Sequence, residues 1–510
     1  MRDSLSREEK RRSWLYAAYI VAGLIAIGAL ALWWPTLPFA EKAGTLPETR
    51  AEVLTASEGL DRIVVDAAFD PDARQLTATQ TLTLVNRTGE ALEEAVLRSY
   101  SGAYLSQETS PAATDELFDS CYYAGFSTGG LLVDGAQVNG ETVDWAFDDD
   151  ARTVLRLPLA APWQPGESIA VTLTWHVHIP RCASRFGEAD GIWALGNVFP
   201  TPAVREDGAW RTDPYISIGD PFVTQCANWV VRLTVPDGYT AAATGYAEPV
   251  TLGDTRVYTF DAPAVRDFAL VVSDRWQVVT GMAEDVMLIA CAADAARARE
   301  MLRYARQAVA CFEAHYGDYV YPTLTLAETG FPFSGMEYPR LVMLGSSAVL
   351  AGGQTLEYAV AHEVAHQWWY AMTGSDPVHQ AWQDESLCEY ALMDYIGRWY
   401  GADARDDAIF ARIETALRIT VPRGVTPGSP IDYFGDLSEY SQVVYHRGAA
   451  LWVALETMMG KDTLDTALRA YGAQYRFSTA TREELTALIS SFAGQDVTPL
   501  MVDYLDTAIN

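Results

Sequence analysis

The sequence predicts a multidomain chain with an N-terminal transmembrane helix, then an antiparallel β-domain, then an α+β domain that binds a metal ion. Three observations support this order. Residues 14–34 form a run of 21 residues without a charge. Short runs of β-branched residues, separated by turn signals, extend from about residue 61 to residue 274. After residue 276 apolar residues recur at helical spacing, and one predicted helix carries two histidines four residues apart.

Residues 14–34 are long enough to cross a bilayer, because a membrane-spanning helix needs about 20 apolar residues. Trp14 and Tyr16 lie at one end of the run and Trp33 and Trp34 at the other, as aromatic residues do at membrane interfaces. Residues 1–13 carry a net charge of +2, which predicts that they are cytoplasmic. A cleaved signal peptide is the alternative, but its apolar core is usually shorter, and the best cleavage-like sequence, residues 29–31, lies inside the run. We therefore expect an uncleaved signal anchor, a single pass through the cell membrane and an extracytoplasmic main body.

The composition of the main body argues against nucleic acid or anionic lipid as a partner. The 510 residues carry a net charge of −31, and removing the +2 of residues 1–13 leaves −33 for the rest. The six cysteines form no CxxC pair, so a metal site built from cysteines is not expected. An exported location permits disulfides, although spacing selects no pairing. Cys311 and Cys388 fall on predicted helices and are expected to be buried free thiols.

Residues 35–50, with proline, glycine and threonine, are predicted to be a linker, and residues 51–275 a β-rich domain. Short β-branched runs at this spacing are typical of an antiparallel arrangement. The predicted strands are residues 63–65, 77–85, 154–157, 169–178, 229–235 and 268–272.

Residues 276–510 are predicted to be an α+β domain. Residues 292–316 have apolar positions at helical spacing, and Gly317 is a suitable stop. Short strands are expected at 324–326 and 341–343. The other predicted helices are residues 357–369, 384–401, 406–419, 443–459, 463–471 and 482–493.

The pattern HEVAH at residues 362–366 predicts a catalytic metal centre. His362 and His366 are four apart, so on a helix they project from one face and can bind one Zn²⁺ together. Glu385, in the first turn of the next predicted helix, offers a third, oxygen ligand. Three protein ligands leave the fourth position open, which is typical of a catalytic zinc. Glu363 lies beside the histidines and can act as a general base on a water molecule.

A surface helix that happens to carry two histidines is the alternative interpretation. The apolar residues that flank the histidines argue against it, because they would leave the imidazoles half buried and in need of partners. Glu389, one turn after Glu385, is expected to be a solvent-facing or structural acid, with support of a ligand imidazole as its alternative role.

These motifs resemble those of the gluzincin zinc aminopeptidase family. HEVAHQWW at 362–369, with eighteen residues between His366 and Glu385 of WQDES, resembles the family's zinc site. SGMEY at 334–338 resembles its G-x-M-E-N exopeptidase motif, and YHRGA at 445–449 resembles the segment with its catalytic tyrosine. The resemblance extends from about residue 61 to the C-terminus.

The sequence departs from the family pattern at two places. Tyr338 replaces the usual asparagine, and Asp384 and Ser386 replace the residues that usually flank the zinc glutamate. Neither change removes a ligand or the base, so the departures concern substrate preference.

The resemblance implies a saddle-like β-domain followed by a thermolysin-like catalytic domain with one Zn²⁺ per chain. Larger relatives have a further helical C-terminal domain, and this chain is expected to be a short bacterial-type member without it. Glu337 would bind the α-ammonium of the substrate, with Gly335 and Met336 in the same substrate-binding segment. Tyr445 would donate to the oxyanion, with Tyr440 as the local alternative.

The predicted function is a membrane-anchored zinc aminopeptidase that acts on peptides with a free N-terminus. One alternative is an endopeptidase or another hydrolase on the same centre, because Glu337 could be an ordinary surface carboxylate. Another is a non-catalytic peptide-binding protein that keeps zinc for structure, although such a protein needs neither Glu363 nor Tyr445. The sequence predicts no oligomeric state.

Overall fold

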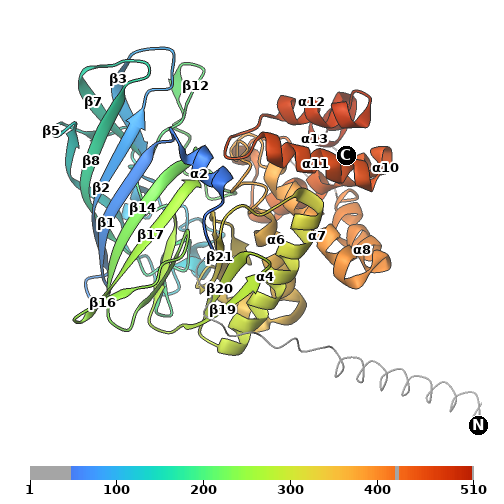
Figure 1. Ribbon diagram of the computed structural model, residues 1–510, viewed down its shortest axis with the longest axis horizontal. Coiled ribbons are helices and arrows are strands. Elements are labelled where there is room, and N and C mark those ends of the chain that lie inside the picture. The colour runs from blue at the N-terminus through green and yellow to red at the C-terminus, as the bar shows by residue number, and fades with distance from the viewer. Residues whose placement is uncertain (1–46, 420–423, 508–510) are drawn as a thin grey trace, which may run out of the picture. The chain divides into compact units, whose positions relative to one another are not determined.

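The structure is a computed structural model that describes residues 47–419 and 424–507 (Figure 1). These residues all fall in one compact unit, Gly44–Asn510. The predicted cytoplasmic residues 1–13, the predicted anchor 14–34 and most of the predicted linker 35–50 lie outside the described residues. None of the helices in the two described ranges is both long and apolar enough to span a membrane.

An eight-stranded sheet dominates the first part of the fold, with the strand order β16-β17-β14-β1-β2-β8-β4-β5. Neighbouring strands are antiparallel, as predicted, except that β1 pairs with β14 in parallel. A parallel pair needs a long connection, and β1 and β14 are far apart in the chain. The strands are β1 Arg62–Asp70, β2 Gln75–Val85, β4 Gly130–Val138, β5 Glu141–Thr142, β8 Ser168–His178, β14 Ala227–Pro236, β16 Val250–Leu252 and β17 Thr255–Val265.

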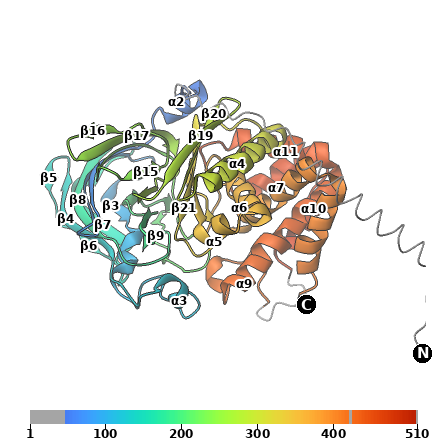
Figure 2. The same cartoon turned by 90° about the horizontal axis from the view of Figure 1, so that it is seen from below.

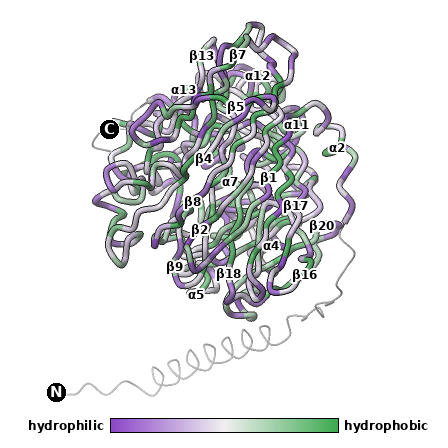
Figure 3. Tube along the Cα trace, turned by 90° about the vertical axis from the view of Figure 1, so that its left-hand side faces the viewer, coloured by the Kyte–Doolittle hydropathy of each residue, from purple (hydrophilic) through white to green (hydrophobic). Residues whose placement is uncertain are grey.

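The strands of this sheet alternate between buried and exposed residues, because successive side chains point to opposite faces. In β2, Leu76, Leu82 and Leu84 are buried, whereas Thr77 and Thr79 are exposed. Hydrophilic and hydrophobic residues also follow one another along β2 and β8 in Figure 3. One face of the sheet therefore packs on the core and the other faces solvent.

Two smaller sheets and a hairpin complete the β-rich part. One sheet has the order β11-β3-β7-β6, and the other has the order β15-β18-β10-β9. The strands β1 to β18 all lie within the predicted domain 51–275, together with three short helices. The remaining elements are α2 Ala51–Ser57, β3 Leu92–Arg98, a 3-10 helix Tyr100–Leu105, α3 Phe118–Cys121, β6 Ala146–Phe147, β7 Val154–Trp163, β9 Phe186–Ala189, β10 Ile192–Leu195, β11 Thr201–Pro202, the hairpin β12 Arg205–Glu206 and β13 Ala209–Trp210, β15 Thr240–Ala243 and β18 Leu270–Ser273.

A five-stranded sheet opens the second part, with the order β19-β20-β21-β23-β22. Its three inner strands, β20, β21 and β23, are parallel, and both edge strands are antiparallel. All residues of β20, β21 and β23 are buried, as is usual for parallel strands. The strands are β19 Gln277–Ala283, β20 Val286–Ala292, β21 Thr323–Thr329, β22 Gly335–Met336 and β23 Leu341–Gly345.

Helices lie beside this sheet, on the side away from the large sheet (Figure 2). The long helix α4, Ala295–Tyr316, begins at Asp294, whose carboxylate accepts from two main-chain N–H groups, and ends at Gly317 as predicted. The other helices are α5 Ser346–Ala351, α6 Gly353–Ala365, α7 Trp382–Tyr400, α8 Ala402–Ala408, α9 Leu437–Tyr440, α10 Gly448–Met459, α11 Lys461–Gln474, α12 Arg482–Ala493 and α13 Thr498–Leu505, with a short 3-10 helix at Ile431–Tyr433.

Several predicted helix boundaries were wrong. The predicted helix 406–419 is split between α8 and a π-helical turn, Ile409–Glu414. The predicted helix 443–459 begins with a second π-helical turn, Ser441–Arg447, before α10. Helix α13 was not predicted. Helices with inserted π-turns keep the apolar spacing of an α-helix at their ends, so periodicity alone does not locate the insertion.

Arg266, just after β17, connects the two parts of the fold. Its buried guanidinium donates to the main-chain oxygens of Thr224, Tyr370 and Ser478 at 2.7–3.0 Å. One side chain therefore joins the β-rich part to the segment that follows α6. The six cysteines are buried free thiols, which confirms the prediction for Cys311 and Cys388.

Candidate metal centre

Helix α6 holds His362 in its last turn, and its N-terminal half is anchored by the buried apolar residues Leu356 and Val360. The helix ends at Ala365, earlier than predicted, and His366 caps it. Tyr370 has a φ of 133°, which no helix can continue through, and the main chain turns there. His366 still lies one turn beyond His362, so both imidazoles face the same side.

The two imidazoles and Glu385, from the first turn of α7, converge as predicted. The Nε2 atoms of His362 and His366 are 3.2 Å apart. Glu385 Oε2 lies 3.4 Å from Nε2 of His362 and 3.2 Å from Nε2 of His366. A tetrahedral zinc with ligand bonds of about 2.0–2.1 Å separates its ligand atoms by about 3.3–3.4 Å. The triangle therefore has the dimensions that a zinc ion requires.

Glu385 Oε2 gives a second indication of a cation. This oxygen is buried and has no hydrogen-bond partner among the described residues. Burial alone would raise the pKa of Glu385, but the neighbouring His366 and His362 lower it to about 2. A buried carboxylate that stays ionised needs a positive partner. A metal ion at the centre of the triangle would supply it.

The other ring nitrogen of His366 has a hydrogen-bond acceptor, and that of His362 faces a carboxylate. His366 Nδ1 lies 3.1 Å from the main-chain oxygen of Trp369, which places the proton on Nδ1 and leaves Nε2 free to bind a metal. His362 Nδ1 lies 3.8 Å from Glu389 Oε2. Glu389 is only 1% exposed and is bound by Arg412 at 2.5 and 3.0 Å. Glu389 therefore does not face solvent, and its pairing with Arg412 agrees with the expected structural acid. Its carboxylate also faces His362, as the alternative role in supporting an imidazole requires.

Glu363 is buried beside the triangle, against Gly335 of β22. Burial raises the pKa of Glu363 to about 7, although the two nearby histidines act to lower it. A carboxyl group with a pKa near neutrality can accept and release a proton. A Cβ atom on Gly335 would lie 2.4 Å from Glu363 Cγ, so only glycine leaves room for this side chain. The resemblance placed Gly335 in the substrate-binding segment, and the structure adds that it makes room for Glu363.

Tyr445 contacts His362 from the π-helical turn before α10. Its ring stacks on the His362 ring at a centroid distance of 5.5 Å, and its hydroxyl donates to Glu385 Oε1 at 2.5 Å. Tyr440 packs edge-on against Tyr445 at 5.7 Å, one ring further from the histidines. The Tyr445 hydroxyl is thus bonded directly to a candidate metal ligand.

Glu337 lies at the same centre and is not the surface carboxylate of the alternative interpretation. It is 6% exposed, and one of its oxygens lies within 4.8 Å of ligand atoms of Glu363 and His366. Burial raises the pKa of Glu337 well above its usual range, and the negative charge of Asp220 raises it further. An ionised Glu337 therefore needs a cation beside it.

The sequence analysis did not identify Asp220 or Arg185 as site residues. An oxygen of Asp220 lies within 4.8 Å of oxygens of Glu337 and Glu385. Arg185 forms an ion pair with Asp220 and donates to Met336 Sδ at 3.1 Å. Asp220 follows Gly219 in a loop between β13 and β14, and a Gly-Asp-Pro sequence in a β-rich region is an ordinary turn signal. Only the packing of the two parts brings it to the centre.

All of these residues line one open cleft of about 600 Å³. Aromatic and apolar side chains form further parts of its wall, namely Phe331, Phe333, Tyr358, Leu392 and Leu437. The cleft combines an apolar lining with a few convergent polar groups, as small-molecule and peptide sites do.

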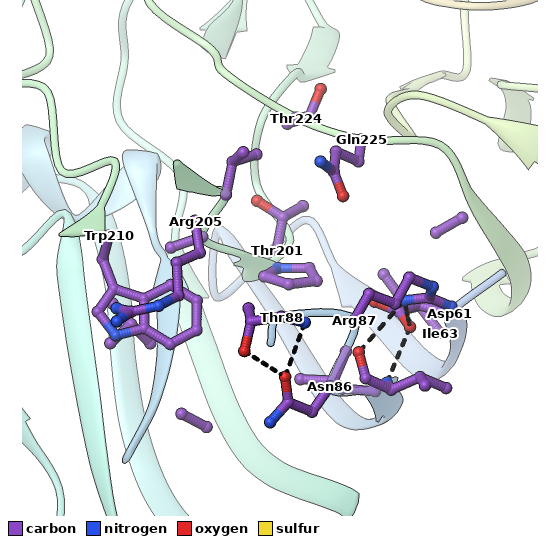
Figure 4. A pocket seen from close by; sticks show the side chains of 18 of the residues that line it. Asp61, Ile63, Asn86, Arg87, Thr88, Thr201, Arg205, Trp210, Thr224 and Gln225 are labelled. Atoms are coloured by element: carbon purple, nitrogen blue, oxygen red, sulfur yellow. Dashed lines mark hydrogen bonds and ion pairs between the residues drawn. The ribbon is translucent and has the colours of Figure 1, made fainter. Parts of the chain in front are cut away.

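A second cavity, of about 260 Å³, lies in the β-rich part and contains none of the predicted site residues (Figure 4). Two pairs of its polar side chains bond to each other. The Thr88 hydroxyl donates to Asn86 Oδ1 at 2.6 Å, and Arg87 donates to Asp61 at 2.6 Å.

Comparisons with known proteins agree with the geometry of the cleft. Residues 301–504 match the family model described as the peptidase family M1 domain. This range contains the three candidate ligands and Glu363, Glu337 and Tyr445.

Two relatives show the extent of the sequence similarity. Leukotriene A-4 hydrolase of Xenopus laevis is 26% identical over 205 residues, which are 39% of this chain and 32% of that protein. Aminopeptidase B of Homo sapiens is 24% identical over 265 residues, which are 48% of this chain and 39% of that protein. The chain therefore spans about a third of the length of these relatives.

Solved structures share the fold over most of the chain. An M1 zinc metallopeptidase from Deinococcus radiodurans has a TM-score of 0.61 at 17% identity, covering 88% of this chain and 93% of that one. A mutant of that metallopeptidase, bound to a Tyr-Ser-Ala substrate, has a TM-score of 0.61 at 16% identity, covering 88% and 94%. The family of these proteins indicates zinc as the cofactor. Residues 301–504 therefore match a peptidase family M1 domain, which confirms the resemblance to the gluzincin zinc aminopeptidases.

Proposed function

We propose that this chain is a zinc aminopeptidase that removes residues from the free amino end of peptides. The observation that carries this proposal is the pair of carboxylates, Glu337 and Asp220, beside the triangle of candidate zinc ligands. A peptide ammonium group between these two acids would provide the cation that an ionised Glu337 needs.

The distance from the acids to the ligands limits which peptide bond is cleaved. In an amino acid the amine nitrogen and the carbonyl carbon are two bonds apart, or about 2.5 Å. An ammonium group on Glu337, whose carboxylate lies within 4.8 Å of Glu363 and His366, would place the first carbonyl of the peptide next to both. The first peptide bond is then the one that reaches the metal. This geometry favours an exopeptidase over an endopeptidase.

The residues of the cleft can divide the chemistry among them. Zinc bound by His362, His366 and Glu385 would lower the pKa of a water molecule towards ~7 and polarise the scissile carbonyl. Glu363 takes the proton from the attacking water and passes it to the leaving amine. The Tyr445 hydroxyl donates to the carbonyl oxygen as negative charge develops on it.

Replacing Glu337 by alanine tests the proposal. An ammonium–carboxylate contact in a partly desolvated cleft contributes ~1.5–3 kcal/mol. Since 1.4 kcal/mol is tenfold, kcat/KM for free-amine substrates should fall by roughly 10–100-fold in Glu337→Ala. N-acetylated substrates lack the ammonium, so they should lose far less. Damage to the zinc site would depress both classes alike, and zinc content is measured beside them. An unchanged ratio between the classes, at normal zinc content, would count against the aminopeptidase.

We further propose, from the sequence alone, that residues 14–34 anchor the chain in the cell membrane with the catalytic domain outside the cytoplasm. The uncharged run and the basic residues before it support this topology. Protease added to intact cells, with any outer envelope permeabilised, should release the catalytic domain. Complete protection together with cytosolic activity would reverse the topology.

A further inference from the structure

We propose that Tyr338 is a positioning residue that holds Glu337 in place by tying its segment to the β-rich part of the fold. This inference rests on the proposed function, because the role of Glu337 is to bind the substrate ammonium. Tyr338 stands where the family motif has asparagine, so the role of that asparagine does not carry over to this side chain.

A chain of two buried hydrogen bonds starts at Tyr338. Its hydroxyl donates to Asn197 Oδ1 at 2.6 Å, and Asn197 Nδ2 donates to Asp267 Oδ2 at 2.7 Å. The three residues are 0%, 4% and 2% exposed. Water cannot substitute for these bonds without entering the core, so each is costly to break.

Glu337 needs such support because its own carboxylate has none. Among the described residues, Glu337 forms no hydrogen bond and no ion pair. Its position therefore depends on its main chain. On one side, Gly335 and Met336 pair with β23. On the other side, the Tyr338 carbonyl accepts from Gln367 Nε2 at 3.2 Å, and its side chain reaches Asn197.

The β-rich part is shaped to receive the phenol. A Cβ atom on Gly196 would lie 2.1 Å from the Tyr338 hydroxyl oxygen and 2.6 Å from Cζ, so a larger residue is excluded. Asn197 has a φ of 51°, in the left-handed region, where asparagine is tolerated better than most residues. Gly196 and Asn197, which follow β10, are thus both suited to the contact with the Tyr338 phenol.

The far end of the chain of bonds is fixed as well. Asp267 Oδ1 accepts from the main-chain N–H of Phe268 at 2.7 Å. The preceding residue is Arg266, whose guanidinium holds the two parts of the fold together. The side chains of Tyr338, Asn197 and Asp267 therefore connect the segment of Glu337 to the position next to Arg266, and Arg266 also holds the segment after α6.

The test compares Tyr338→Phe with Tyr321→Phe in the zinc-loaded full chain. Tyr321 is a matched control, because its buried hydroxyl also crosses between the two parts, to the Ala264 main-chain oxygen at 2.7 Å, but outside the cleft. Each variant is assayed with leucine 4-nitroanilide and its N-acetyl derivative. Tyr338→Phe should raise KM for the free-amine substrate roughly tenfold, the factor that the loss of one buried hydrogen bond can account for, with a smaller change in kcat. The N-acetyl substrate and Tyr321→Phe should change little in KM.

A double mutant isolates the bond itself. Asn197→Gly tolerates the positive φ and removes the acceptor. If Tyr338 acts through Asn197, the double variant should be no worse in KM than Asn197→Gly alone. Additive effects of the two changes, or an unchanged KM in Tyr338→Phe, would overturn the inference. A wild-type enzyme that does not distinguish the two substrates would instead overturn the proposed function, and the inference with it.

Discussion

Gly335→Ala should disable the enzyme without unfolding it, because the added methyl group falls on Glu363, the proposed base. The new Cβ would lie 2.4 Å from Glu363 Cγ, 2.5 Å from Cδ and 2.6 Å from Oε1. Carbon atoms in contact are normally about 3.5–4.0 Å apart, so the two groups overlap by about 1 Å. Gly335 is held by its pairing with Leu344. The Glu363 side chain is therefore the part that moves.

The size of the effect follows from that displacement. Misplacing a catalytic group by about 1 Å costs roughly 100-fold in rate, which corresponds to about 2.7 kcal/mol of activation free energy. The stability of the fold should change by less than about 1 kcal/mol, since the end of a flexible side chain can rotate away. The metal ligands are not touched, so zinc content should stay at one per chain.

The assay measures kcat/KM on an aminoacyl 4-nitroanilide, with zinc content and the midpoint of thermal unfolding. Gly281→Ala is the matched control, because Gly281 is in β19 of the same sheet and its nearest atom, Leu302 Cδ1, would be 3.7 Å from the new Cβ. The control should keep wild-type activity. A Gly335→Ala enzyme within threefold of wild type, with normal zinc, would refute the reasoning about how Glu363 is placed.

Three further predictions concern single side chains. Glu363→Gln should keep zinc but lose on the order of 10²–10⁴ in kcat, because the amide cannot accept a proton; near-normal turnover would exclude Glu363 as the base. Tyr445→Phe should lose roughly 10²–10³ in kcat with zinc retained, and a larger loss in Tyr440→Phe would transfer the donor role to Tyr440. Burial raises the pKa of Asp267 from 3.8 to about 7, so in the wild type the folded state loses stability as pH rises from about 4 to 7. The free energy of unfolding falls by ~1.4 kcal/mol per pH unit between pH 5 and the pKa of about 7, so about 3 kcal/mol is lost between pH 5 and 8. Asp267→Asn should lack this loss. Urea unfolding of the wild type and of Asp267→Asn at pH 5 and pH 8 measures it, and an equal loss of stability in both proteins would show that Asp267 is not responsible.

The candidate site was predictable where its residues are close in sequence. His362, Glu363 and His366 are brought together by one helical turn, and Glu385 opens the next helix, so local periodicity was sufficient. Asp220 reaches the same centre from a loop of the β-rich part. No local pattern distinguishes such a residue from any other turn acid, because its role depends on how two distant segments pack.

In the fold, too, local features were predictable and features that depend on distant segments were not. The strands of the β-rich part were predictable from alternation, as in β2 and β8. The parallel pairing of β1 with β14 was not, since alternation fixes which face is buried and not the direction of the neighbouring strand. The end of α6 was misplaced because the apolar residues Trp368 and Trp369 continue the helical spacing, although the helix already ends at Ala365.

One measurement tests the central claim most directly. A synthetic decapeptide and its N-acetylated form are incubated with enzyme carrying one zinc per chain, and the products are identified by mass spectrometry. The account predicts a ladder of products shortened from the amino end of the free peptide, an intact acetylated peptide and no products from either when a chelator is present. Internal cleavage of both peptides would contradict it, because Glu337 and Asp220 would then not be selecting a free amino group.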